Sequence, residues 1–256
     1  MRSIFHRVLT LGLIGGSVLG SIVLPLTLPQ KAQALTQQEV SSKLASIPAF
    51  IVANSEGAYI TSRLVGQSED GEAEQEVALL YVFFSGQDAE EYLTLQQQEN
   101  PNFAPSGVVG WVELAALYQQ AKAERDVPLR LLFVPQGEEV SAAVEINGDF
   151  ASGVPVFLPR YRDDGSYMLL PIGNLNDGEP IVPAFFSQQD IETTLAALAE
   201  ARPEVRDRIE IEVVSLESLI SQMETADDDN LNLLYLLPDS DAINYIRAAE
   251  GEQQAP

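Results

Sequence analysis

The sequence predicts a mixed α/β protein of two pseudo-symmetric halves, each a mixed sheet with packed helices, derived from an internal duplication. The first observation is a repeat: Phe-Phe-Ser-Gly-Gln-Asp at 83–88 returns 102 residues later as Phe-Phe-Ser-Gln-Gln-Asp at 185–190. Leu-Leu-Phe-Val at 131–134 is matched at the same spacing by Leu-Leu-Tyr-Leu at 233–236. The second observation is that apolar runs of strand length alternate with helix-capping signals, an order typical of helices packed on a partly parallel sheet.

Each half opens with a hairpin. Thr36 precedes Glu39 at capping-box spacing, which predicts a helix over 36–44 before the first hairpin. Apolar runs at 49–53 and 58–64 flank the turn sequence Asn-Ser-Glu-Gly, so we expect them to pair as antiparallel strands. The equivalent runs of the second half are 154–161 and 166–170, on either side of Arg-Asp-Asp-Gly.

Each half then continues as strand, helix, strand, helix and strand. Strands at 77–84 and 181–186 both end in Phe-Phe-Ser. Ser85 and Asp88 then have the spacing of a helix N-cap, and the second half repeats this spacing. The later strands are expected at 108–112, 129–134, 209–214 and 231–237, and the later helices at 113–123, 215–223 and 239–249. The halves are therefore bounded as 35–135 and 136–256, and together they are expected to form one compact unit.

Residues 1–34 are predicted to be a secretory signal peptide outside the fold. Arg2 and Arg7 give a positive start, and residues 8–28 are mostly apolar. Ala-Gln-Ala at 32–34 is a cleavage signal of the small-x-small type. Cleavage would make Leu35 the new N-terminus and leave no stable membrane insertion, whereas an uncleaved anchor helix is the alternative.

The mature chain would contain neither cysteine nor histidine, because the sequence has no cysteine and its one histidine is His6. This composition excludes Ser-His-Asp and Cys-His catalysis, zinc sites that need Cys or His, histidine-bound haem and iron–sulfur clusters. The sequence has no glycine motif for a phosphate or a dinucleotide. We therefore expect no catalytic residue, no metal site and no cofactor.

The net charge of the chain indicates which classes of partner it can bind. Loss of the leader cations Arg2, Arg7 and Lys31 leaves 11 basic residues against 38 acidic ones, a formal charge of −27. Such a surface repels nucleic acid and anionic lipid headgroups, and it favours neutral or basic partners. The simplest role of the acidic surface is to keep the protein soluble.

Ordered apolar and turn motifs carry a resemblance to a known family. Ile-Pro-Ala-Phe at 47–50 and Val-Pro-Val-Phe at 154–157 open the two hairpins. The other motifs are the helix openings at 84–89 and 186–191, the strand-to-helix turn Val-Val-Ser-Leu-Glu at 213–217 and the closing Leu-Leu-Pro at 236–238. Over residues 36–249 the chain resembles the Tic twenty-two family, a chloroplast import-associated component with cyanobacterial homologues.

The resemblance implies a non-enzymatic, chaperone-like protein with paired hydrophobic pockets, which assists protein translocation or outer-membrane protein biogenesis. Its clients would be unfolded or membrane-destined proteins, and an Omp85-type outer-membrane insertase would be a further partner. The compartment would be the periplasm or, alternatively, the thylakoid lumen.

Six large aromatic side chains are the candidate client-binding residues: Phe83, Phe84, Trp111, Tyr118, Phe185 and Phe186. Neighbours in a strand point to opposite faces, so one phenylalanine of each pair is expected in the core and the other on the second face. A helix over that face would make all four core residues, whereas an open face would give a groove for extended apolar segments. Trp111 is the better groove candidate, and it departs from the plainer valine-rich strand that the family pattern suggests.

Two other functions stay open: an adaptor subunit that binds a folded partner such as the insertase, and a hydrolase that uses two carboxylates. No spacing among the 38 acidic residues singles out a catalytic pair. Asp227, Asp228 and Asp229 could supply oxygen ligands to calcium, but they lack the spacing of a calcium loop. A solvated loop is the simpler interpretation of these aspartates.

Overall fold

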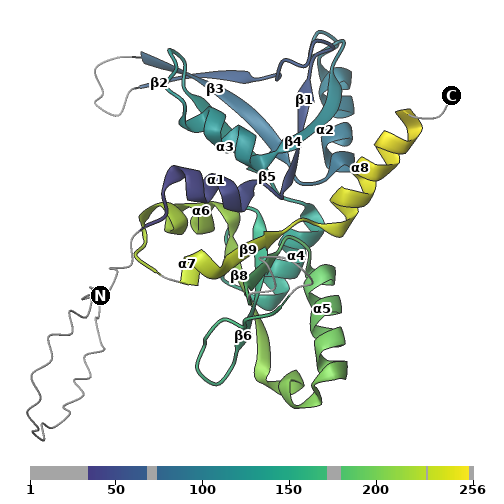
Figure 1. The fold of residues 1–256 in the computed structure, drawn as a ribbon. Helices are drawn as coiled ribbons and strands as arrows, with labels where there is room; N and C mark the ends of the chain where they lie inside the picture. The colour runs from purple at the N-terminus through teal and green to yellow at the C-terminus, as the bar shows by residue number, and fades with distance from the viewer. Residues whose placement is uncertain (1–33, 68–73, 172–179, 229, 254–256) are drawn as a thin grey trace, which may run out of the picture. The chain divides into compact units, whose positions relative to one another are not determined.

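The computed structural model describes residues 34–67, 74–171, 180–228 and 230–253 (Figure 1). All of them belong to one compact unit, Ala32–Pro256. The predicted signal peptide, apart from Ala34, lies outside the described residues. Within the described ranges, no helix is both long enough and apolar enough to cross a membrane.

Five strands form the first sheet. They are β1 (Pro48–Ala53), β2 (Ser62–Gln67), β3 (Glu74–Phe83), β4 (Val108–Glu113) and β5 (Leu129–Val134). β1 pairs antiparallel with β3 and β4, so that Phe50 lies opposite Phe83 on one side and opposite Trp111 on the other. β3 also pairs antiparallel with β2 and parallel with β5. β4 therefore lies at an edge of this sheet.

Four strands form the second sheet and pair in a matching way. They are β6 (Pro155–Tyr161), β7 (Val182–Phe185), β8 (Ile209–Ser215) and β9 (Leu234–Leu237). β6 pairs antiparallel with β7 and β8, and β9 runs parallel to β7. The mixed α/β class predicted from the sequence is confirmed. Descent of the two halves from an internal duplication stays a prediction.

Three predicted strands differ from the structure. Residues 58–64 are expected to pair with 49–53, but within this segment only Tyr59 forms a bridge to that strand, with Ala53. The strand β2 begins at Ser62 and pairs with β3 instead.

Residues 166–170 form only single bridges, Tyr167 with Arg160 and Leu170 with Ile181. Pro159 of β6 accepts the backbone N–H of Met168 but has no N–H to donate in return, so the ladder does not continue. The predicted strand 231–237 begins instead as the short helix α7 (Asn230–Leu233), where the Asp228 carboxylate accepts hydrogen bonds from the backbone and side chain of Asn230.

Seven longer helices lie within the described residues. They are α1 (Gln37–Leu44), α2 (Gly86–Glu99), α3 (Leu114–Lys122), α4 (Gly137–Ile146), α5 (Gln188–Ala201), α6 (Leu216–Thr225) and α8 (Ser240–Gln253), and a 3-10 turn (Pro203–Arg208) follows α5. The predicted capping box of Thr36 and Glu39 is formed. The hydroxyls of Ser85 and Ser187 accept the predicted N-cap hydrogen bonds of α2 and α5.

The largest core lies between the two sheets, where α1, α3 and α6 contribute side chains to it. The opposite, outer face of each sheet is covered by a helix pair. α2 and α8 cover the first sheet around Phe50 and Phe83, and α4 and α5 cover the second sheet around Phe157 and Phe185. α8 therefore returns the end of the chain to the first half (Figure 1).

Candidate functional site

Five of the six candidate client-binding aromatics are buried: Phe83, Phe84, Tyr118, Phe185 and Phe186. Phe84 and Phe186 point into the shared core, where their rings stack with centroids 5.3 Å apart. Phe83 and Phe185 point to the outer faces, beneath the covering helices. All four phenylalanines are thus core residues in this structure. The alternative of an open sheet face, with one phenylalanine of each pair exposed, is not what the structure has. A role of these residues in client binding stays a prediction.

Tyr118 lies in a polar cluster that joins α3 to α6. Its hydroxyl donates to Glu224 Oε1 over 2.7 Å, and Lys122 Nζ lies 2.6 Å from the same oxygen. Burial and the hydrogen bond to Glu224 raise the pKa of Tyr118. Burial opposes ionisation of Glu224, but hydrogen bonds from Lys122 and Tyr118 outweigh it and lower the pKa of Glu224. The hydrogen bond from Tyr118 to Glu224 therefore links the first half of the chain to the second, which gives Tyr118 a structural role.

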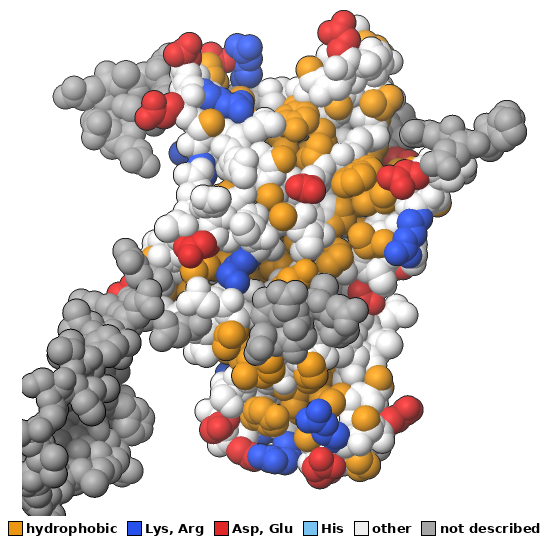
Figure 2. All heavy atoms as spheres, viewed as in Figure 1, with side chains coloured by type: hydrophobic (Ala, Val, Ile, Leu, Met, Phe, Trp, Pro, Cys, Tyr) orange, Lys and Arg blue, Asp and Glu red, His pale blue; other side chains and the backbone are white. Residues whose placement is uncertain are grey.

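Trp111 is the exposed member of the predicted set. Its side chain is 45% exposed on the edge strand β4, and Val108 of the same strand is 51% exposed. On the side shown in Figure 2, hydrophobic side chains also gather over the region of α2 and α8 and over the second half near α5. Apolar surface is therefore present outside the core of both halves.

The outer helix pairs leave shallow grooves that no sequence pattern predicted. A groove of about 410 Å³ over the second sheet is lined by Ile146, Arg162, Leu195, Ile209, Glu210 and Ile211. A more polar groove of about 700 Å³ between α2 and α8 is lined by Gln87, Glu90, Glu91, Thr94, Leu95 and Tyr245. Helical periodicity can place Leu95 and Leu195 on helix surfaces. It does not show which neighbouring helix forms the other wall.

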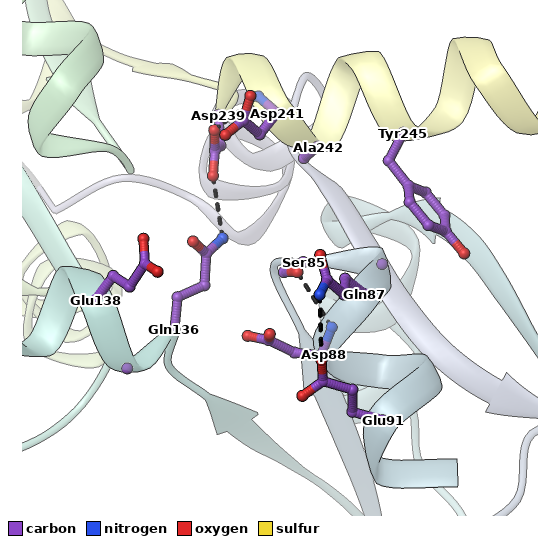
Figure 3. Close-up of a pocket in the computed structure, with 12 residues that line it drawn as sticks. Ser85, Gln87, Asp88, Glu91, Gln136, Glu138, Asp239, Asp241, Ala242 and Tyr245 are labelled. Atoms are coloured by element: carbon purple, nitrogen blue, oxygen red, sulfur yellow. Dashed lines mark hydrogen bonds between the residues drawn. The ribbon is translucent and has the colours of Figure 1, made fainter. Parts of the chain in front are cut away.

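A polar cavity of about 520 Å³ lies where the N-termini of α2, α4 and α8 meet (Figure 3). Its acidic side chains are Asp88, Glu91, Glu138, Asp239 and Asp241. Gln136 Nε2 donates to Asp239 Oδ2 over 3.0 Å, and burial raises the pKa of Asp88 and of Asp239. In the part of the chain that the structure describes, no three potential metal-ligating side chains are arranged to hold an ion.

Acidic side chains beside this cavity bond to helix N-termini. Glu139 Oε2 accepts the backbone N–H of Gln188 over 2.9 Å, so α4 caps α5. Asp190 accepts the backbone N–H and the hydroxyl of Ser240 over 2.9 and 2.8 Å, so α5 caps α8. Carboxylates are stabilised at helix N-termini by the helix dipole. Glu139 and Asp190 thus have a structural role as helix caps.

Two of the three candidate calcium-ligating aspartates accept backbone hydrogen bonds. Asp227 Oδ1 accepts a hydrogen bond from the backbone N–H of Ala34, and Asp228 Oδ1 accepts one from the backbone N–H of Asn230. Asp229 lies outside the described residues. Asp227 thus contacts the N-terminal end of the described chain, whereas Asp228 makes a local turn.

Comparisons with known proteins agree with the fold and the motifs. A family model, that of the Tic22-like family, matches residues 20–248. The protein TIC 22, chloroplastic, of Pisum sativum is 26% identical over 205 residues, which cover 78% of this chain and 72% of the pea protein. These matches cover most of the predicted mature chain.

Two solved structures share the fold. The structure of Anabaena Tic22, a protein of protein transport, has a TM-score of 0.68 at 23% identity, over 84% of this chain and 97% of that one. Tic22 from Plasmodium falciparum has a TM-score of 0.61 at 16% identity, over 83% of this chain and 98% of that one. Since the family model spans both sheets and the motifs that open and close them, this chain belongs to the Tic22-like family.

Proposed function

We propose that this chain is a non-enzymatic, chaperone-like protein that assists protein translocation or outer-membrane protein biogenesis by binding apolar segments of unfolded or membrane-destined clients. Membership of a family with a relative in protein transport supports a transport role. The observation that carries client binding is the exposed apolar edge strand with Trp111. A wide apolar surface on a soluble protein usually marks a binding site.

The proposed compartment is extracytoplasmic, because the sequence begins with a predicted signal peptide. The periplasm is the first candidate and the thylakoid lumen is the alternative. An Omp85-type insertase is the proposed folded partner, to which clients would be delivered. The formal charge of −27 would keep the protein soluble while it carries apolar segments.

Suppression of aggregation of an unfolded outer-membrane β-barrel protein tests the proposal. Trp111→Glu should weaken suppression, because a charge at the apolar edge must be desolvated when a client binds. Val144→Glu is the matched control, because Val144 on α4 is also 45% exposed. Circular dichroism and urea unfolding check that both variants fold. If a folded Trp111→Glu variant suppresses aggregation as well as the wild type does, the proposal that clients bind at the edge of β4 is wrong. The adaptor function then becomes the better proposal.

A further inference from the structure

The outer edge of β4 has backbone groups that point away from the first sheet. The N–H of Leu114 donates to the carbonyl of Ile47 over 2.8 Å, which fixes the phase of the ladder between β4 and β1. In an antiparallel ladder, bonded and non-bonded pairs alternate. The N–H and C=O groups of Val109 and Trp111 therefore point outward, and within the described ranges no hydrogen-bond partner is found for them.

The equivalent edge of the second sheet is protected. The β8 residues Glu210 and Glu212 both form ion pairs with Arg160. The carbonyl of Ile209 accepts a hydrogen bond from Arg162 Nε over 3.0 Å. Charged side chains along an edge strand disfavour the addition of another strand.

The edge of β9 is occupied by side chains from the first half. Lys43 Nζ donates to the carbonyl of Leu234 over 2.9 Å, and Ser46 Oγ donates to the carbonyl of Leu236 over 3.1 Å. β4 lacks such protection, because it reads Val-Val-Gly-Trp-Val before its final Glu113. An apolar edge strand without charge, proline or a covering side chain is a template for strand pairing.

We propose that the edge of β4 binds an extended segment of a client protein as an added strand. This inference rests on the proposed function, since it specifies how an unfolded client is held. The occupant is a neutral or basic client segment, because a second copy would carry the same formal charge of −27 and be repelled. Backbone hydrogen bonds give such binding its strength without demanding one client sequence.

The side chains around β4 define which segments bind best. A β-branched or aromatic residue opposite Trp111 would add apolar contact, because cross-strand pairs of this kind stabilise a sheet. Glu113 is exposed at the end of the strand and would favour lysine or arginine in the neighbouring position of the client. The preferred segment is therefore extended, apolar on alternate residues and basic at one end.

Amide hydrogen exchange with a synthetic peptide tests strand addition directly. The probe is a short peptide of alternating valine and threonine that ends in lysine. On peptide binding, exchange at the outward amides of Val109 and Trp111 should slow by about tenfold or more. The amides of Val108, Gly110 and Val112, which face β1, are internal controls and should change little.

A proline at the outward position provides the matching variant. Val109→Pro removes one outward N–H and blocks the approach of a strand, while the bonds to β1 remain. Ile211→Pro is the control, because Ile211 has the same outward position on β8. Val109→Pro should weaken peptide binding about tenfold, as expected for lost hydrogen bonds, and Ile211→Pro should leave it unchanged.

The possible outcomes separate this inference from the proposed function. If the peptide binds while exchange at Val109 and Trp111 is unchanged, strand addition is overturned, although binding of apolar segments stands. If the wild type neither binds the peptide nor suppresses aggregation, both fail. If Val109→Pro does not fold, the exchange measurement on the wild type alone decides.

Discussion

Adjacent phenylalanines in each half serve two different cores. Phe84 and Phe186 stack between the sheets, whereas Phe83 and Phe185 lie under the outer helices. Close packing makes removal of a buried ring costly, because the surrounding structure relaxes only in part. A large aromatic side chain at an exposed edge, such as that of Trp111, contributes less to stability and is available for contact.

Phe84→Ala should destabilise the protein by about 3–5 kcal/mol, because it leaves a cavity against Phe186 and Phe133. Trp111→Ala should change the free energy of unfolding by no more than about 1 kcal/mol, because its side chain is half-exposed. Urea unfolding measures both. Equal losses in the two variants would contradict the division of these aromatics into core and surface.

The buried acids near the helix N-termini predict a pH dependence. Burial raises the pKa of Asp88, Glu139 and Asp239. Their charged forms are therefore penalised in the folded state above the raised pKa values. The free energy of unfolding should rise as the pH falls from 7 through those values toward about 4, the usual pKa of these groups in the unfolded chain.

Urea unfolding at successive pH values tests this dependence. Asp239→Asn should flatten the rise, because one penalised charge is removed. Among the described residues, three carboxyl groups have a lowered pKa: Glu39, Asp164 and Glu224. Their stabilisation is lost at still lower pH, so the trend reverses there. A steady fall in stability from pH 7 downward would show that the buried acids do not govern the profile.

At the scale of elements, the contact of α8 with α2 closes the outer face of the first sheet. Tyr245 of α8 meets Phe50 edge-on with ring centroids 5.3 Å apart. The same ring lies against Gly86, the first residue of α2, so that an added Cβ would overlap it. A glycine is therefore needed where these two helices meet.

Gly86→Ala should destabilise the protein by about 1–3 kcal/mol by pushing α8 away from its site. Gly137→Ala is the control: Gly137 also begins a helix, but an added Cβ there meets no atom within 4 Å. That change should be neutral or stabilise by up to about 1 kcal/mol. In the Gly86→Ala background, Tyr245→Ala should recover part of the loss. Similar effects of the two glycine changes would argue against tight docking of α8.

Sequence patterns that span only a few residues, such as helix caps, predicted the starts of helices well. The serine caps of α2 and α5 follow from the three-residue spacing of Ser85 and Asp88 and of Ser187 and Asp190. The apolar run after the second turn predicted a strand that is not formed, because Pro159 on the facing strand has no N–H to donate to Met168. Strand pairing across the sheet, such as Phe50 with Trp111, depends on residues far apart in the chain, so local patterns could not predict it.

At the scale of the whole molecule, packing between distant segments decides which aromatic residues are core. Phe83 is covered by Tyr92 of α2 and also by Ala242 and Ile246 of α8, which return to the first sheet from far along the chain. Alternation within a strand places Phe83 on the second face but cannot show that a helix covers it. The sequence therefore favoured Trp111 as the groove candidate but could not show that all four phenylalanines are covered.

The most direct measurement of the central claim is site-specific photocrosslinking to a defined client. A photoreactive residue replaces Trp111 on β4 or, as control, Val144 on α4, and a denatured outer-membrane β-barrel protein is diluted into the mixture. We predict strong crosslinking from position 111 to the unfolded client, little from position 144, and little from either to the folded barrel. Equal yields from both positions, or crosslinking only to the folded barrel, would contradict client binding at the edge of the first sheet.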